Sequence, residues 1–415
     1  MKETLYPTHH KSEIQLECLH NSICERCQSN KSKHYIDEYG RTVCLDCFQS
    51  GLCTTGELLY RHERIVFNLI HTLDLKYSLS EDQFIGSQFF MSCIIEKKYG
   101  FLEAVCGAGK TEMLYQGFLN GLNSGMKICF AIPRKQIVIQ IKNRLQSVFP
   151  KTIVKAIHGD SKDDDGAHII VSTIQQLIHY YHEFDILVID EVDAFPLEGN
   201  VMYHRFIRKA IKEDGILFLM SATKIKSLNL YLEEYSMRVC SLYRKFHNVA
   251  QDLPINKHVR GLYRKFYQGI IPKSVLTILR EWIENGSRIF VFVPTIKLAD
   301  VVFQALHKVF PESGKITSLT EYKEQLINQF DKNQIKILVT TSVLERGVTF
   351  SKLNVMVLYA DHRIYTEEML IQIAGRVGRK KESPSGEILF ISENISEEIV
   401  RSIESINFKN RMAGF

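Results

Sequence analysis

The first stretch with the residue types and spacing of a catalytic site runs from Ala104 to Thr111 and reads Ala-Val-Cys-Gly-Ala-Gly-Lys-Thr. It follows a short apolar run and precedes a helix-like segment, which is the strand–loop–helix context of a phosphate-binding loop. Glycines in the loop would let backbone N–H groups turn toward phosphate oxygens. Lys110 can reach the outer phosphates, and the Thr111 hydroxyl can hold Mg²⁺. We therefore predict a nucleoside triphosphate site made of Ala104, Gly107, Ala108, Gly109, Lys110 and Thr111.

A second stretch supplies carboxylates. Asp190-Glu191-Val192-Asp193 ends another apolar run, residues 186–189, and so lies at the C-terminal edge of a predicted strand. Ligands of α/β sheets bind at this edge. We expect Asp190 to hold Mg²⁺ together with Thr111, and Glu191 to orient or deprotonate the attacking water. Together the two stretches predict hydrolysis of a nucleoside triphosphate.

Three further positions complete the predicted site. Gln83 lies upstream of the loop, and its amide could read the adenine edge of ATP because it both donates and accepts; it could equally be a surface glutamine on a helix. Arg376 and Arg379 are three residues apart, so we expect them to share one helical face and to stabilise charge on the transferred phosphate. Gln372 could help to place the water.

Four cysteines near the start have the spacing of a metal site. Cys24-x-x-Cys27 and Cys44-x-x-Cys47 each offer two thiolates to one tetrahedral ion, so we predict structural Zn²⁺. The segment between them, residues 34–43, is expected to form a hairpin that turns at Tyr39-Gly40. The other cysteines are irregularly spaced and are expected in the core. The module could dock a partner protein, or touch nucleic acid through Lys31, Lys33 and Arg41.

The composition limits the class of protein. The chain has 415 residues, 45% hydrophobic and 24% charged, which is typical of a globular protein of two or three domains. No apolar stretch is long enough to span a bilayer, and residues 1–10 have no apolar signal core, so we expect a cytoplasmic protein. The formal net charge is +5. Residues 1–60 hold six Lys/Arg against eight Asp/Glu, so attraction to a nucleic acid is expected from the rest of the chain.

Apolar runs that stop at polar residues alternate with helix-like segments from residue 100 to residue 392. This alternation predicts an α/β fold with two parallel-sheet lobes after the four-cysteine zinc module, and the family resemblance described below implies that these lobes are RecA-like. The expected divisions are the N-terminal region with the module, the ATP-binding lobe 1, a basic interdomain linker and lobe 2, at residues 1–60, 61–245, 246–275 and 276–415.

The order and spacing of these stretches resemble those of superfamily-2 helicases and translocases over residues 80–380. Residues 104–111 look like motif I of that family, 190–193 like motif II, 221–223 like motif III, 340–349 like motif V and 372–379 like motif VI. The resemblance implies that nucleotide state is relayed by Asp193, Ser221, Ala222, Thr223 and Gly347. It also implies nucleic-acid contacts from Pro133, Arg134, Thr173, Thr295, Thr340, Thr341 and Thr349.

With a four-cysteine module ahead of this core, the whole chain is similar to the ComFA family of late competence proteins. That resemblance implies an ATPase, stimulated by single-stranded DNA, that helps to import transforming DNA. It also implies partners: a ComFC-like phosphoribosyltransferase-like protein, a DprA-like recombination mediator and, indirectly, the membrane channel for DNA uptake, which could hold the protein at the cytoplasmic face of the membrane. The alternatives are a duplex-unwinding helicase such as the PriA family, and an adaptor switched by ATP.

One basic repeat lies between the two predicted lobes. Leu242-Tyr243-Arg244-Lys245-Phe246 recurs as residues 262–266. The surrounding segment, 242–280, contains eight Lys/Arg and one acidic residue. Arg264 and Lys265 could meet single-stranded DNA by charge and stacking. The alternative is a pair of linker strands with a solvated charged face.

Overall fold

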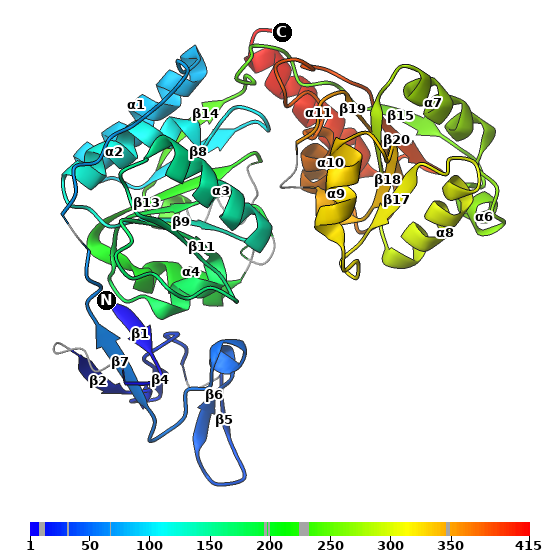
Figure 1. The fold of residues 1–415 in the computed structure, drawn as a ribbon. Coiled ribbons are helices and arrows are strands. Elements are labelled where there is room, and N and C mark those ends of the chain that lie inside the picture. The colour runs from blue at the N-terminus through cyan, green and yellow to red at the C-terminus, as the bar shows by residue number, and fades with distance from the viewer. Residues whose placement is uncertain are drawn as a thin grey trace. The chain divides into compact units, whose positions relative to one another are not determined.

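The computed structural model describes residues 1–7, 13–30, 33–66, 68–194, 197, 200–223, 232–345 and 349–415, with the backbone alone at 48–50 (Figure 1). The chain divides into two units. One unit combines Met1–Glu103 with Lys110–Ser241, and the other combines Ala104–Gly109 with Leu242–Phe415. Among the described residues, no helix has the length and apolar character that crossing a bilayer requires.

The first unit begins with a small module of short strands. The strands β1 (Lys2–Thr4), β7 (Leu58–His62) and β2 (Ile14–Glu17) form an antiparallel sheet in that order. β3 (Leu19–His20) pairs with β4 (Ile23–Cys24), and the 3₁₀ helix η2 covers Leu45–Ser50. The predicted hairpin is confirmed as β5 (His34–Ile36) paired with β6 (Thr42–Cys44). Its turn contains Gly40 at φ +73°, a left-handed conformation that favours glycine.

A seven-stranded sheet forms the body of the first unit. Its order is β10-β11-β9-β12-β13-β8-β14. The bounds of the strands are β8 Gly100–Ala104, β9 Ile128–Ile132, β10 Val154–Ile157, β11 Ile169–Thr173, β12 Phe184–Ile189, β13 Ile211–Ser221 and β14 Arg238–Leu242. The pairs from β10 to β8 are parallel, so their C-terminal ends meet at one edge. β8, β9 and β11 are buried along their whole length, as expected for strands covered on both faces.

Helices connect these strands. Their bounds are α1 Glu81–Glu96, η3 Glu112–Leu114, α2 Tyr115–Asn123, α3 Lys135–Val148, η4 Ile174–His179 and α4 Val201–Ala210. α2 and α3 pack on β9, and α1 and α4 pack on β13. The sequence also favours a mainly helical segment from about Arg61 to Lys98, and this is confirmed only for its second half, which contains α1. Arg61 belongs to β7, and the helix begins only at Glu81 because Ser80 caps it.

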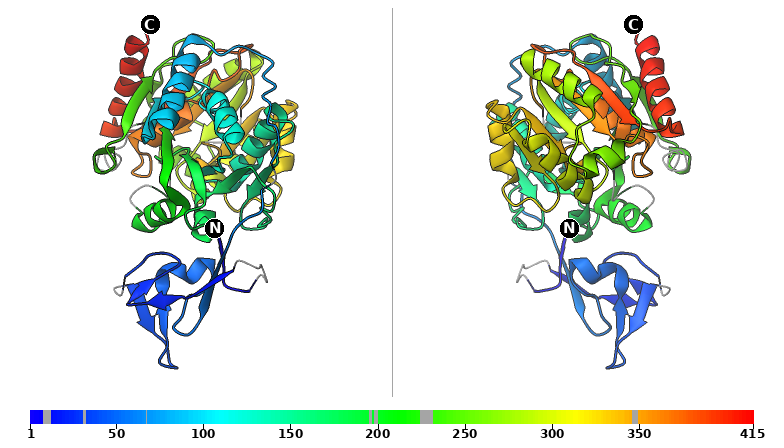
Figure 2. Two further views of the ribbon diagram at one scale, coloured as in Figure 1. Left: turned by 90° about the vertical axis from the view of Figure 1, so that its left-hand side faces the viewer. Right: turned by 90° about the vertical axis from the view of Figure 1, so that its right-hand side faces the viewer.

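The second unit contains a six-stranded parallel sheet with the order β15-β20-β19-β16-β18-β17. Its elements are coloured from yellow-green to red in the side views of Figure 2. The strands are β15 Ile255–His258, β16 Arg288–Phe292, β17 Ser313–Ile316, β18 Ile337–Thr340, β19 Leu353–Leu358 and β20 Ile388–Ser392. The helices are α6 Leu262–Tyr267, α7 Lys273–Glu284, α8 Ile296–His307, α9 Lys323–Asp331, η5 Ser342–Leu344, α10 Glu367–Ala374 and α11 Glu397–Met412. The predicted fold class, two parallel-sheet lobes after a cysteine module, is confirmed.

The segment assigned to a linker, residues 246–275, is part of the second unit. β15 pairs with β20, and Leu262 and Phe266 of α6 are buried in the core. The two copies of Leu-Tyr-Arg-Lys-Phe adopt different structures, since 262–266 is helical and 243–246 is not. Apolar residues four apart, such as Leu262 and Phe266, stabilise a helix when they pack against a core. The same five residues therefore adopt different structures in different tertiary surroundings.

Candidate nucleotide, nucleic-acid and metal sites

The predicted phosphate loop follows β8 directly. Ala104 is the last residue of β8 and is fully buried. Gly107 and Gly109 have φ values of +81° and +78°, so both positions favour glycine. Such conformations turn successive backbone N–H groups toward one side, which is the arrangement that binds phosphate oxygens. Ala108 is buried, and its N–H donates to Val105 O at 3.1 Å, which fixes the shape of the loop.

The predicted metal-binding carboxylate lies beside the loop lysine. Asp190 follows β12 and is only 8% exposed. Burial raises the pKa of Asp190 to about 6, and the positive charge of Lys110 opposes that rise, so the ammonium group is within electrostatic reach. The Thr111 hydroxyl and the Asp190 carboxylate are hard oxygen ligands of the kind that Mg²⁺ takes. Burial favours the protonated form of this carboxylate. A bound cation would favour the ionised form, so the residue fits a metal site.

Glu191 has a distinct backbone conformation. Its φ of +55° is in the left-handed region, and its N–H donates to Asp190 Oδ1 at 2.8 Å. The two carboxylates therefore follow each other directly at the end of β12. The roles of Mg²⁺ ligand for Asp190 and of general base for Glu191 stay predictions.

A hydrogen-bonded chain joins the acidic stretch to the end of β13. Thr223 Oγ1 donates to Asp193 Oδ2 at 2.7 Å, and Ser221 Oγ donates to Thr223 O at 2.6 Å. These three side chains are buried, as is Ala222. The structure therefore brings together four of the five residues expected to relay the nucleotide state. The fifth, Gly347, lies outside the described residues.

Gln83 is a helix-capping residue. It is 5% exposed, so it is not the surface glutamine of the alternative interpretation. Its Oε1 accepts from Ser80 N–H at 3.0 Å, and its own N–H donates to Ser80 Oγ at 3.4 Å. This capping box fixes the amide at the start of α1. An adenine contact would then use the amide NH₂ and the second lone pair of the oxygen.

The motif VI residues in the second unit lie at the end of α10. Gln372 is inside the helix and 3% exposed, and Arg376 is 1% exposed. The expectation that Arg376 and Arg379 share a helical face is wrong, because α10 ends at Ala374. Gly378, at φ +66°, continues the turn, and Arg379 Nε donates back to Gly375 O at 2.7 Å. Arg376 therefore lies on the turn that follows α10, and Arg379 comes directly after that turn.

The residues expected to contact nucleic acid differ in exposure. Pro133 and Arg134 precede α3, and Thr173 ends β11. Thr340 is fully buried and its hydroxyl donates to Thr341 O at 3.1 Å, while Thr295 caps α8 by accepting from Leu298 N–H. Thr341 is buried, whereas Thr349 and Arg264 are exposed. Lys265 donates to Arg260 O at 3.1 Å.

The four cysteines of the module converge. Cys24, Cys27, Cys44 and Cys47 are fully buried, and their sulfurs all lie within 4.8 Å of one another. The Cys24–Cys47 and Cys27–Cys44 Sγ distances are 3.6 Å and 3.4 Å. Tetrahedral zinc with bonds of about 2.3 Å requires sulfurs about 3.8 Å apart. The cluster is therefore compatible with zinc.

The thiols also influence one another. Hydrogen bonds from Cys24 and Cys27 hold the pKa of Cys44 well below its usual range. Ser29, which the sequence interpretation missed, has its hydroxyl 3.1 Å from Cys44 Sγ and 3.2 Å from Cys27 Sγ. Its position two residues after a Cys-x-x-Cys pair was the available signal. A hydroxyl beside metal-binding sulfurs is typical of the supporting shell of a metal site.

Comparison with known proteins extends this picture. Residues 57–226 match the family described as type III restriction enzyme, res subunit, and residues 272–381 match the helicase conserved C-terminal domain. The competence protein ComFA of Streptococcus pneumoniae is 29% identical, over 94% of this chain and 91% of that protein. ComFA of Bacillus subtilis is 28% identical, over 94% and 86%. The chain is a ComFA-like superfamily-2 helicase. As such it is an ATP-hydrolysing enzyme of the helicase and translocase class.

Solved structures agree on the fold of this ComFA-like chain. Dbp5 of S. cerevisiae bound to RNA and ADP BeF₃ has a TM-score of 0.60 at 19% identity, covering 80% of this chain and 92% of that one. The Mycobacterium smegmatis helicase Lhr bound to ssDNA and AMP-PNP has a TM-score of 0.59 at 14% identity, covering 81% and 48%. At these identities the likeness concerns the fold alone, and it confirms two RecA-like lobes.

Proposed function

We propose that this protein is a single-stranded-DNA-dependent ATPase that moves along DNA and powers the import of transforming DNA. The observation that carries the proposal is the similarity to ComFA over 94% of the chain, which includes the cysteine module as well as both lobes. A helicase core alone would match many unwinding and remodelling enzymes. The module placed ahead of the core is the part that favours DNA uptake.

The proposed chemistry uses the residues described above. Lys110 and the loop N–H groups bind the triphosphate, with Gln83 at the base, and Glu191 accepts the proton of the attacking water, which Gln372 helps to place. Arg376 and Arg379 supply positive charge as the phosphate is transferred. Mg²⁺, held by Thr111 and Asp190, would neutralise phosphate charge when it is bound. The Asp193–Thr223–Ser221 chain would report the nucleotide state to the nucleic-acid contacts.

The cysteine module is proposed to bind structural Zn²⁺ through all four thiolates. Four protein ligands leave no position open for substrate, so its role would be to hold the module folded. The proposed partners are single-stranded DNA, a ComFC-like protein and a DprA-like mediator. They would work at the cytoplasmic face of the membrane beside the DNA-uptake channel.

The test is phosphate release measured with single-stranded DNA, duplex DNA and RNA as separate titrations. Lys110→Ala serves as the blank. We expect single-stranded DNA to stimulate turnover most, and Glu191→Gln to bind ATP without hydrolysing it. Equal turnover with and without DNA would favour an ATP-switched adaptor. Strand separation on a tailed duplex would instead favour a duplex-unwinding helicase.

A further inference from the structure

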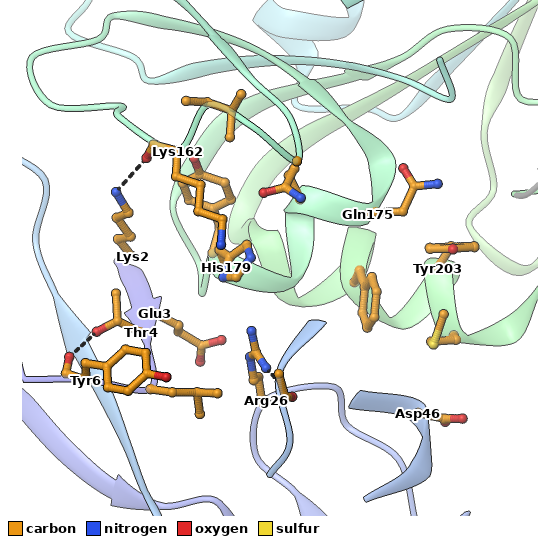
Figure 3. Close-up of a pocket in the computed structure, with 18 of the residues that line it drawn as sticks. Lys2, Glu3, Thr4, Tyr6, Arg26, Asp46, Lys162, Gln175, His179 and Tyr203 are labelled. Carbon is orange, nitrogen blue, oxygen red and sulfur yellow. Dashed lines mark hydrogen bonds between the residues drawn. The ribbon is translucent and has the colours of Figure 1, made fainter. Parts of the chain in front are cut away.

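A cavity of about 1060 Å³ lies inside the first unit, where the cysteine module meets the seven-stranded sheet (Figure 3). Small-molecule sites usually occupy roughly 300–1,000 Å³, so this cavity is large enough for a nucleotide. Its walls come from β1 and the cysteine-bearing loops on one side, and from η4, α4 and the residues after β10 on the other. None of the residues proposed to bind ATP lines it.

The cavity is rich in positive charge. Lys2, Arg26 and Lys162 line it, and Lys209 lies just behind its wall. The lining carboxylates are Glu3 and Asp46, and both are engaged, Glu3 with Arg61 and Lys209 and Asp46 with Arg205 at 2.8 Å. Lys2 pairs with Asp164, but the Lys162 ammonium has no carboxylate partner in the part of the chain that the structure describes. The net field in the cavity therefore favours an anion.

The positive charge around the cavity affects the pKa of His179 on η4. Burial is the largest cause that lowers the pKa of His179 to about 3, and the charges of Arg26, Lys209, Lys162 and Lys2 contribute to the same shift. Figure 3 shows Lys162 and Arg26 reaching toward His179 from opposite sides of the cavity. A histidine surrounded in this way stays neutral at pH 7 and can donate one hydrogen bond to an anion.

Other lining side chains suit a base. Tyr203 of α4 lies in the wall with its ring 5.7 Å from that of Phe206, and Tyr6 is 78% exposed beside the opening. Gln175 lines the cavity near Tyr203, and its amide can both donate to and accept from a base edge. Aromatic rings beside a cationic groove are the usual combination in proteins that bind single strands without sequence preference.

The cavity is also lined by residues close in sequence to a proposed nucleic-acid contact. Ile157 and Gly159 are at the C-terminal end of β10, and Gln175 is two residues beyond Thr173 at the end of β11. Thr173 is one of the proposed nucleic-acid contacts. A nucleic-acid strand bound at Thr173 would therefore be two residues along the chain from a residue that lines the cavity.

We propose that this cavity is a nucleotide-binding subsite for single-stranded nucleic acid, with its phosphate on Lys162, Arg26 and His179 and its base against Tyr203. The subsite extends the track of the proposed motor onto the cysteine module, and the inference rests on the proposed function. The shared chemistry is a phosphate with an attached base, which a free mononucleotide would also supply. Because Thr173, a proposed nucleic-acid contact, lies two residues from the lining residue Gln175, we favour single-stranded nucleic acid over a free mononucleotide.

The test compares Lys162→Gln with Lys151→Gln. These exposed lysines lie on opposite ends of β10, and only Lys162 lines the cavity. Binding of a labelled oligothymidine is measured across a range of salt concentrations. Loss of one phosphate contact lowers the slope of log K against log salt by about 0.7 for a single strand. We expect that change in Lys162→Gln alone, with basal ATP turnover unchanged, and a several-fold loss of affinity in Tyr203→Ala.

Equal slopes in Lys162→Gln, Lys151→Gln and the unaltered protein would overturn the subsite. Tight binding of thymidine monophosphate that is abolished in Lys162→Gln would refute single-stranded nucleic acid as the ligand and would indicate a free nucleotide instead. If the unaltered protein binds no oligothymidine at any salt concentration, the proposed motor function itself fails. The two failures are therefore distinguishable.

Discussion

Substituting Lys209 by Met should weaken the attachment of the cysteine module to the first lobe, so that the module opens locally more often. Lys209 is 4% exposed, and its Nζ donates to Arg26 O at 2.6 Å, to Ile178 O at 2.7 Å and to the fully buried Glu3 carboxylate. Methionine keeps the apolar stem but removes the charge and all three hydrogen bonds. Glu3 would retain one charged partner, Arg61, at 2.8 Å.

The expected magnitude follows from these contacts. Breaking a buried ion pair by removing one member costs about 3–5 kcal/mol. We take the lower end, about 3 kcal/mol, because Arg61 still neutralises Glu3. At about 1.4 kcal/mol per factor of ten, local opening of the module should become roughly a hundredfold more frequent. Hydrogen exchange of the β1 and β7 amides measures that opening directly.

The matched control is Lys155→Met, whose partner Asp163 has a side chain that is 71% exposed. Such surface pairs contribute about 0–1 kcal/mol. The double variant with Glu3→Gln should cost less than the sum of the single variants, because it no longer leaves a buried carboxylate short of a cation. Exchange in Lys209→Met that is less than tenfold faster than in the control would refute the reasoning.

Three other predictions follow from the described contacts. Thr223→Val removes the 2.7 Å hydrogen bond to buried Asp193, so we expect basal ATP turnover to persist while stimulation by single-stranded DNA falls severalfold, measured as phosphate release; unaltered stimulation would argue against the relay. Cys44→Ser should reduce bound zinc, assayed by mass spectrometry of the native protein, and should expose the module to protease; a stoichiometric zinc content in this variant would exclude the four-thiolate site. Because the pKa of His179 is lowered to about 3 in the folded protein, the unfolded chain binds more protons than the folded protein below pH 6.5. The free energy of unfolding should therefore decrease as the pH is lowered from 6.5 toward 3, by up to about 1.4 kcal/mol per pH unit. In urea unfolding between pH 7 and pH 5, His179→Gln should show a smaller decrease.

Several features of this protein were predictable because they depend on short sequence spacing. The Cys-x-x-Cys pairs and the hairpin between them were predicted from local spacing, and the structure brings the four sulfurs together. The phosphate loop and the acidic stretch each follow a buried strand, so their placement at strand ends followed from apolar patterning. Roles for individual residues within these stretches stay predictions.

Other features could not be read from local patterns. The concentration of positive charge around Arg264 predicts a linker, whereas Leu262 and Phe266 pack in the core of the second unit and so determine the structure of this segment. The spacing of three between Arg376 and Arg379 predicts one helical face, but α10 ends before them, with Gly375 as its C-cap and Gly378 at a positive φ. Propensity and spacing are weak where packing or a turn decides the backbone.

The sequence by itself determined which chemical groups the chain carries: the glycines of a phosphate-loop pattern, paired carboxylates and four cysteine thiols, at spacings that local geometry can satisfy. Only the tertiary structure decided that the module is joined to the first lobe through the buried Glu3, Arg61 and Lys209 charges, and that a cationic cavity lies at this junction. Lys209 and Glu3 are separated by 206 residues. No periodicity relates positions so far apart, because their contact exists only once the strands, helices and module have packed.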